Sequence, residues 1–193
     1  MQATVMPSFP AGKSAGTGGF LDPENIVSGF NVTKGMKVAD FGCGAGYFTI
    51  LLAEKTGEEG RVYAVDVQEP ALDNVRAKAR ANGLNNIDTI RANLEVMGSS
   101  GLTDNSQDMV LLANILFQSG KKAEIIKEAK RVLKSKGKLI IIDWKNGVNG
   151  FGPPHELRLD VPKIQQIATK DGFEFEHNLD AGQFHFGLVF KKQ

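Results

Sequence analysis

Residues 38–49, VADFGCGAGYFT, place three glycines, Gly42, Gly44 and Gly46, within five positions directly after an apolar run. Glycine tolerates positive φ and lets a ligand or another segment approach the backbone closely. The apolar run predicts a strand, and the residues after the glycines predict a helix. The stretch therefore predicts a strand–turn–helix unit whose turn either binds a ligand or packs tightly against a neighbour.

The rest of the chain continues this alternation of strands and helices. Strands are predicted at 36–41, 61–67, 87–92, 109–113 and 138–144, and helices at 46–55, 69–82, 121–133 and 162–171. A short helix within 20–30 precedes them, and a hairpin of 172–179 and 183–190 follows. The pattern predicts an α/β fold: an open, mostly parallel sheet with one antiparallel strand, in a single domain over 20–193. Residues 1–19, rich in Gly, Ser and Pro, are predicted to be flexible.

Composition excludes several classes of function. The chain has 193 residues with a net charge of +1, so no basic footprint indicates nucleic-acid binding. The single cysteine, Cys43, forms no internal disulfide or cysteine-based metal site, and we expect no metal. No signal peptide or membrane-length apolar run is found, and we expect a cytoplasmic protein, monomeric or homodimeric, without membrane partners.

The glycine turn is open to two cofactor classes, dinucleotides and S-adenosylmethionine. The dinucleotide pattern G-x-G-x-x-G would place its third glycine at position 47, where the chain has Tyr47; the third glycine, Gly46, comes one residue early. An acid, Asp40, also stands two residues before the first glycine, which the dinucleotide pattern does not require. These differences favour S-adenosylmethionine.

The two strands that follow supply further candidate contacts. Asp66 ends the predicted strand 61–67, where its carboxylate is placed to accept the ribose hydroxyls of either cofactor; the alternative is a helix N-cap. Asn93 and Leu94 follow the third strand and are candidates for the edge and the face of an adenine. Taken alone, an asparagine such as Asn93 is more often a turn residue than an adenine contact.

These motifs together resemble the class I S-adenosylmethionine-dependent methyltransferases, and within them the small UbiE-like group. The resemblance covers roughly residues 20–191 and rests on GMKVADFGCGAGYFT, GRVYAVDVQEPAL, LTDNSQDMVLLANIL, KEAKRVLKSKGKLIIID and GPPHELR. It implies a Rossmann-like three-layer sandwich with strand order 3-2-1-4-5-7-6. It also implies S-adenosylmethionine as cofactor and S-adenosylhomocysteine as product. With the other residues of the glycine turn included, the resemblance implies a cofactor site of ten residues: Asp40, Gly42, Cys43, Gly44, Gly46, Asp66, Val67, Asn93, Leu94 and Asn114.

The acceptor and the catalytic base are less clear. No Asp/Asn-Pro-Pro-aromatic tetrad of amino-methylating nucleic-acid enzymes follows the fourth strand, so we expect a small-molecule acceptor. We expect a catalytic base to lie beyond the carboxyl ends of the fourth and fifth predicted strands. The candidates there are Asp143 and His155. His177 and His185 alternate with phenylalanines in the hairpin and are interpreted as non-catalytic.

Three functions stay open from the sequence: a methyltransferase, a non-catalytic S-adenosylmethionine-binding sensor or partner subunit, and a nicotinamide-dependent oxidoreductase. Phe117 stands where many UbiE-like proteins have a histidine, which leaves room for the second. Gly46 comes one residue earlier than the dinucleotide pattern requires, which argues against the nicotinamide-dependent oxidoreductase.

Overall fold

The computed structural model describes residues 21–148 and 152–193, so the prediction for 1–19 lies outside the described residues. Seven strands are found there: β1 (Lys37–Phe41), β2 (Arg61–Asp66), β3 (Ile87–Arg91), β4 (Gln107–Ala113), β5 (Leu133–Trp144), β6 (Phe173–Asp180) and β7 (His185–Lys192). They form one sheet in the order β3-β2-β1-β4-β5-β7-β6, which confirms the predicted order. β7 pairs antiparallel with both β5 and β6, whereas the other pairs are parallel.

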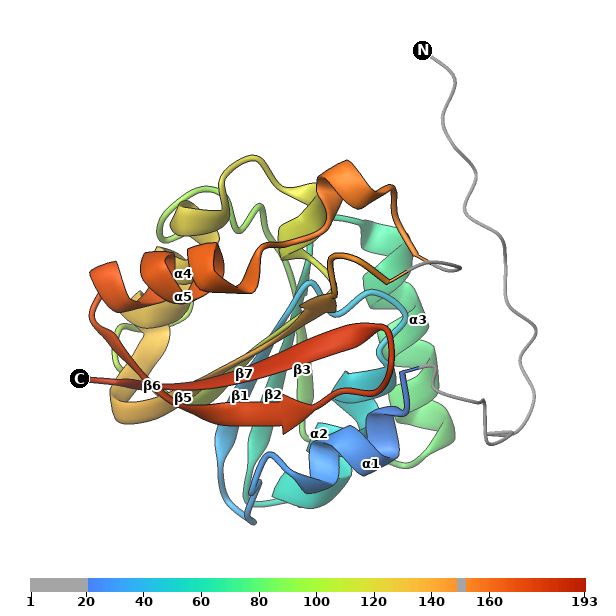
Figure 1. Ribbon diagram of the computed structural model, residues 1–193. Coiled ribbons are helices and arrows are strands. Elements are labelled where there is room, and N and C mark those ends of the chain that lie inside the picture. Colours follow the sequence, from blue (N-terminus) through green and yellow to red (C-terminus); the bar gives the residue numbers. More distant parts are fainter. Residues whose placement is uncertain (1–20, 149–151) are drawn as a thin grey trace.

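Helices cover both faces of the sheet (Figure 1). The helices are α1 (Pro23–Ser28), α2 (Tyr47–Thr56), α3 (Glu69–Ala81), α4 (Lys122–Val132) and α5 (Val161–Lys170), with short 3-10 turns η1 (Leu116–Gln118) and η2 (His155–Leu157). α1, α2 and α3 lie on one face, and α4 and α5 on the other. Two buried apolar clusters, one on each side of the sheet, form the core, as expected for strands with continuous apolar runs.

Local sequence explains the helix boundaries. In α1 the Asp22 side chain accepts a hydrogen bond from the Asn25 N–H at 3.3 Å, so Asp22 is the predicted N-cap. In α4 the buried residues Ile125, Ile126, Ala129 and Val132 recur at helical spacing and face the sheet.

Five strands begin one to five residues away from the predicted positions, and for β5 and β7 the pairing explains the difference. β5 begins at Leu133, five residues before the expected 138, because Leu133 pairs with Gln107 of β4 before a turn in which Lys136 has a φ of 65°. β7 runs from His185 rather than 183, because its pairing with β5 ends at the pair His185–Trp144.

The topology positions one crevice. The strand order reverses between β1 and β4, which are neighbours in the sheet although β2 and β3 lie between them in sequence. In open α/β sheets such a reversal leaves a crevice at the carboxyl ends of the strands, and the glycine turn follows β1 there.

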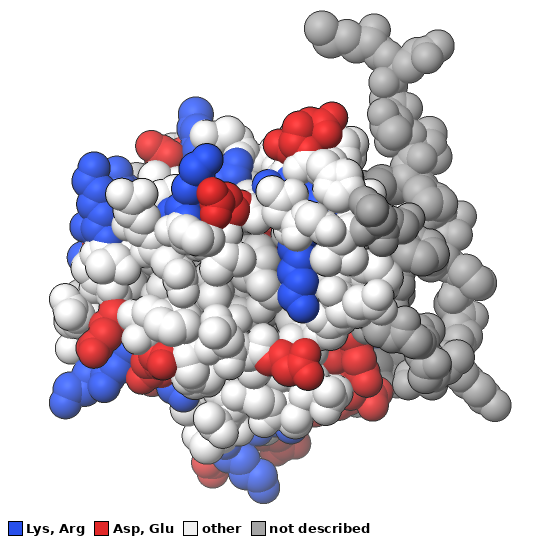
Figure 2. Space-filling model, in the orientation of Figure 1, with Lys and Arg blue, Asp and Glu red and all other residues white. Residues whose placement is uncertain are grey.

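On the face shown in Figure 2, acidic and basic side chains are intermixed. In residues 21–148 and 152–193, no helix combines the length and apolar character needed to cross a membrane.

Candidate cofactor site

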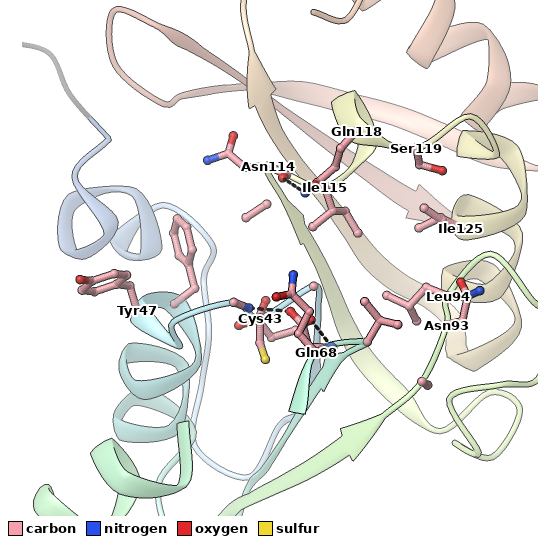
Figure 3. A pocket seen from close by; sticks show the side chains of 18 of the residues that line it. Cys43, Tyr47, Gln68, Asn93, Leu94, Asn114, Ile115, Gln118, Ser119 and Ile125 are labelled. Carbon is pink, nitrogen blue, oxygen red and sulfur yellow. Dashed lines mark hydrogen bonds between the residues drawn. The ribbon is translucent and has the colours of Figure 1, made fainter. Parts of the chain in front are cut away.

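A cavity of about 510 Å³ lies at the carboxyl ends of β1, β2 and β4 (Figure 3). Nine of the ten residues predicted to bind the cofactor line it: Asp40, Gly42, Cys43, Gly44, Asp66, Val67, Asn93, Leu94 and Asn114. The structure thus brings together residues that the sequence separates by more than 70 positions. The tenth residue, Gly46, lies outside the lining.

Each glycine of the turn meets a different environment. A Cβ on Gly42 would come within 2.1 Å of Ile115 Cγ2, and a Cβ on Gly46 within 2.8 Å of Val75 Cγ2 in α3. A Cβ on Gly44 would meet no protein atom within 4 Å. All three have positive φ. Gly42 and Gly46 are therefore required by close packing, whereas Gly44 adjoins open space in the cavity, where a ligand can approach the backbone.

The Asp66 carboxylate is hydrogen-bonded to the backbone of this turn and of the segment after β2. Its Oδ2 accepts the Gly44 N–H at 2.9 Å, and its Oδ1 accepts the Gln68 N–H at 2.9 Å. The carboxylate is 9% exposed. Each oxygen keeps a further lone pair, because a carboxylate accepts about four hydrogen bonds. Asp66 is thus held rigidly by backbone donors and still able to accept hydroxyl groups from a ligand.

Asp40 supplies a second, more deeply buried acid. The Thr49 hydroxyl donates to Asp40 Oδ2 at 2.6 Å. Burial raises the pKa of Asp40 to about 6; the Thr49 hydrogen bond lowers the pKa, and the charge of Asp66 raises it further. The cavity therefore contains a carboxyl group that a nearby cation would stabilise in its ionised form.

The charges of the cavity distinguish between the two cofactor classes. Asp40, Asp66 and Glu95 line it, and no Lys, Arg or His is among the described residues of its lining. S-adenosylmethionine carries positive charge on its sulfonium and amino groups, whereas a dinucleotide carries a negatively charged pyrophosphate. An acidic cavity favours the first and opposes the second.

The opposite end of the cavity is mainly apolar, with Leu94, Ile115 and Ile125 in its lining.

Polar side chains also lie beside this end of the cavity. Asn93 is exposed, and its Oδ1 accepts the Glu95 N–H at 3.0 Å, so its NH₂ group is left to donate to a ligand. Glu95 in turn accepts the Ser119 hydroxyl at 2.7 Å. Gln68, Glu95, Ile115 and Ser119 line the cavity but were not predicted. Gln68, Glu95 and Ile115 each stand next to a predicted residue, whereas Ser119 carried no sequence signal.

Asn114 follows β4 and has a φ of 57°. Its N–H donates to the Ile142 carbonyl at 2.8 Å, and its own carbonyl accepts the Gln118 side chain at 3.1 Å. Its side-chain Oδ1 is buried without a hydrogen-bond partner in the described part of the chain. In Figure 3 the Asn114 side chain lies on the α1 side of β4, apart from Gln118 and Ser119.

Comparison with known proteins agrees with this geometry. The family model for the methyltransferase domain matches residues 32–181. The chain belongs to this methyltransferase family.

Several relatives of this methyltransferase are known. A SAM-dependent methyltransferase from Aquifex aeolicus has a similar structure, with a TM-score of 0.82 and 30% identity, covering 90% of this chain and 91% of that one. A putative type 11 methyltransferase from Sulfolobus solfataricus has a TM-score of 0.75 and 29% identity, covering 90% and 94%.

Among curated proteins, the ubiquinone/menaquinone biosynthesis C-methyltransferase UbiE of Shewanella sp. strain ANA-3 is 30% identical over 161 residues. That match covers 78% of this chain and 61% of the relative, so the chain spans less than two thirds of the relative's length. Over that span the chain is similar to the UbiE-like group.

Neither candidate base lines the cavity of the methyltransferase. Asp143 is fully buried, and its carboxylate accepts the N–H groups of Leu116, Phe117 and Trp144 at 3.1, 3.2 and 2.8 Å. Burial raises the pKa of Asp143 to about 7, against the lowering effect of these bonds. His155 is exposed at the start of η2. The geometry assigns Asp143 to holding η1 in place, and gives His155 no contact with the cavity.

No group of three or more His, Cys, Asp or Glu side chains suited to a metal ion occurs within residues 21–148 and 152–193. Cys43 is buried, and burial together with the charges of Asp40 and Asp66 raises the pKa of its thiol. Its thiol is therefore kept protonated, which fits a packing residue rather than a nucleophile.

Proposed function

We propose that the 510 Å³ cavity binds S-adenosylmethionine and that the enzyme methylates a small-molecule acceptor. The observation that carries the proposal is the Asp66 carboxylate, fixed by the Gly44 and Gln68 N–H groups beside the open space at Gly44. Asp66 would accept the ribose hydroxyls. Leu94, Ile115 and Ile125 would cover the adenine.

Asp40 lies at the other end of the turn and would face the cationic methionyl part. When bound, S-adenosylmethionine supplies an electrophilic methyl group, so the protein's own tasks are alignment and exclusion of water. The apolar lining provided by Phe48 and Ile115 fits the second task.

The names of the relatives suggest where to begin the search for an acceptor. UbiE of Shewanella is a C-methyltransferase of quinone biosynthesis, and this chain spans 61% of it. Hydroquinones are therefore the first acceptors to assay, beside an unrelated panel of phenols, amines and thiols.

The test is turnover. The purified protein is incubated with methyl-labelled S-adenosylmethionine with and without each acceptor, and S-adenosylhomocysteine and the labelled product are quantified by mass spectrometry. We expect acceptor-dependent formation of both in a one-to-one ratio. Binding of the cofactor without turnover against the whole panel would contradict the enzymatic proposal and favour a non-catalytic binding protein.

A further inference from the structure

A second cavity, of about 520 Å³, lies at the opposite end of β4 from the cofactor cavity. Its lining includes residues that precede β4 and β6 and the end of β7: Asp104, Asn105, Asp171, Gly172 and Lys192. Figure 1 shows the C-terminus of the chain and the end of α5 that leads into β6 on the same side of the molecule. The two cavities share no lining residue, and the length of β4, about 20 Å, separates them. The second cavity is therefore a separate site.

Basic side chains dominate the lining of this second cavity. Five of its ten lining residues are basic: Lys127, Lys130, Arg131, Lys170 and Lys192. Arg131 forms ion pairs with Asp104 at 2.5 Å and with Glu128 at 2.8 Å. None of the four lysines has an ion pair in the described part of the chain. Because Asp104 is engaged by Arg131, Asp171 is the one other acidic residue of the lining that faces four lysines.

The end of α4 does not require Lys127 and Lys130 as caps. Lysines near a helix C-terminus often donate to the carbonyl groups that have no partner within the helix. The last four carbonyls of α4 already have donors: the N–H groups of Leu133, Asn105 and Ser106 and the ammonium group of Lys192. The ammonium groups of Lys127 and Lys130 therefore have no hydrogen-bond partner within residues 21–148 and 152–193.

The lysines lie close to one another around the cavity. Lys127 and Lys130 are one turn apart on α4, so they project from the same side of the helix. A Cβ on Gly172 would lie 2.6 Å from Lys130 Nζ, so this ammonium group lies against the backbone just after Lys170. Burial lowers the pKa of Lys192, and the charge of Lys130 lowers it further. The positive charges repel one another here, and an anionic ligand would relieve that repulsion.

The donors that remain restrict the ligand. Lys192 Nζ already donates to Asn105 Oδ1 and to the carbonyls of Lys130 and Leu133, each at 2.7 Å, so it contributes charge to the site. The other lysines keep their N–H donors, and ammonium groups bind phosphate as point charges. A single carboxylate would leave most of the lysines without a counter-charge, whereas a phosphate or pyrophosphate group carries two or more negative charges. The volume of 520 Å³ is in the range of small-molecule sites.

We propose that this second cavity binds a small phosphate-bearing anion with two or more negative charges. Lys127, Lys130 and Lys170 would donate to its oxygens, and Lys192 would add to the positive field. A ligand there is about 20 Å from the cofactor cavity, the length of β4, which is too far to receive a methyl group, so it is not the acceptor. The inference goes beyond the proposed function and does not depend on it.

The test is calorimetric titration of the full chain with sodium pyrophosphate in about 0.15 M NaCl, where attraction between distant exposed charges is largely screened. We expect saturable one-to-one binding of pyrophosphate and no binding of acetate, which carries a single charge. Lys127→Gln combined with Lys130→Gln should weaken pyrophosphate binding by roughly tenfold or more, because charge-assisted hydrogen bonds are lost. The absence of saturable binding to the wild type would overturn the inference.

A second double variant controls for the change in net charge. Lys34→Gln combined with Lys55→Gln removes two exposed lysines outside this cavity, and Lys55 lies in the last turn of α2 as Lys130 does in α4. This variant should bind pyrophosphate as the wild type does. Both double variants should keep the wild-type Tm, because exposed or half-buried lysines are replaced by another good helix former or lie in a loop. Equal losses of affinity in the two variants would overturn the inference.

Two further titrations locate the anion. Saturating S-adenosylhomocysteine should leave the pyrophosphate affinity unchanged; displacement of pyrophosphate would place the anion in the cofactor cavity and overturn the inference. Cosedimentation with vesicles of phosphatidylcholine and phosphatidic acid, without binding of pyrophosphate, would assign the phosphate to a lipid headgroup and overturn the small-anion assignment. Failure to bind S-adenosylhomocysteine while pyrophosphate still binds would overturn only the proposed function.

Discussion

Gly42 and Ile115 are in such close contact that a Cβ on the glycine would lie 2.1 Å from Ile115 Cγ2. This contact joins the turn after β1 to the segment after β4, across the point where the strand order reverses. Gly42→Ala should therefore displace Ile115 and strain a backbone with a φ of 77°. We expect a loss of about 2–5 kcal/mol in the free energy of unfolding, from strain plus overpacking, measured by urea denaturation. A loss below about 1 kcal/mol, smaller than the strain alone, would contradict the role of this contact.

Comparing Gly44→Ala with Gly83→Ala should distinguish an effect on stability from an effect on cofactor affinity. Gly44 (φ 49°) and Gly83 (φ 66°) both have positive φ and open space where a Cβ would stand, but only Gly44 lines the cavity. Both alanine variants should lose about 1–2 kcal/mol of stability from backbone strain. Only Gly44→Ala should lose S-adenosylmethionine affinity as well, because its Cβ enters the space beside the ligand. Equal calorimetric affinities for the two variants would contradict the position of the site.

Asp40 should make both stability and binding depend on pH. The pKa of Asp40 is raised from 3.8 to about 6, so the folded protein holds this proton more tightly than the unfolded chain. The ionised group therefore lowers stability above pH 6 by about 3 kcal/mol, and this penalty disappears as pH falls below about 4. Asp40→Asn should be more stable than the wild type at pH 8 and nearly equal to it at pH 4.

A cationic ligand favours ionised Asp40, so wild-type affinity for S-adenosylmethionine should decrease as pH falls through 6. In Asp40→Asn the affinity should be weaker at pH 8 and lack this dependence. Calorimetry between pH 5 and 8 measures both. A pH-independent wild-type affinity would show that Asp40 does not face the positive charge.

Asp143→Asn tests whether this residue positions η1. The carboxylate accepts three backbone N–H groups, whereas an asparagine offers one acceptor oxygen and turns an NH₂ group toward the others. We expect a loss of about 1–3 kcal/mol in stability and weaker cofactor binding, because Gln118 ends η1, Asn114 precedes it, and both line the cavity. Asp180→Asn is the control, since that exposed carboxylate accepts one N–H, from Gly182. Similar effects at the two sites would argue against a positioning role for Asp143.

The sequence predicted the alternating strands and helices and the glycine turn because both follow from local signals: apolar runs, glycine spacing and the acid that ends β2. The strand order came from the resemblance to the methyltransferase family. It did not predict what His185 and Asp143 contact. Alternation along a strand gives the face of a side chain, but its neighbours come from distant segments. For Asp143 these are the N–H groups of η1. For His185 they are Trp144 and two cations.

The contribution of Glu95 and Ser119 was missed for the same reason. They are separated by 24 positions and hydrogen-bond only after β3 and β4 are assembled in one sheet. The late start of β7 likewise depends on its pairing with β5.

The central claim is that Asp66 holds S-adenosylmethionine in an acidic cavity. The most direct test is calorimetric titration of the wild type and of Asp66→Ala with S-adenosylmethionine, S-adenosylhomocysteine and NAD. Asp88→Ala, an exposed acid paired with Arg61, is the matched control. We predict that the wild type and Asp88→Ala bind both sulfur ligands and not NAD, and that Asp66→Ala loses at least tenfold in affinity. NAD binding, or an Asp66→Ala affinity equal to that of the wild type, would contradict the account.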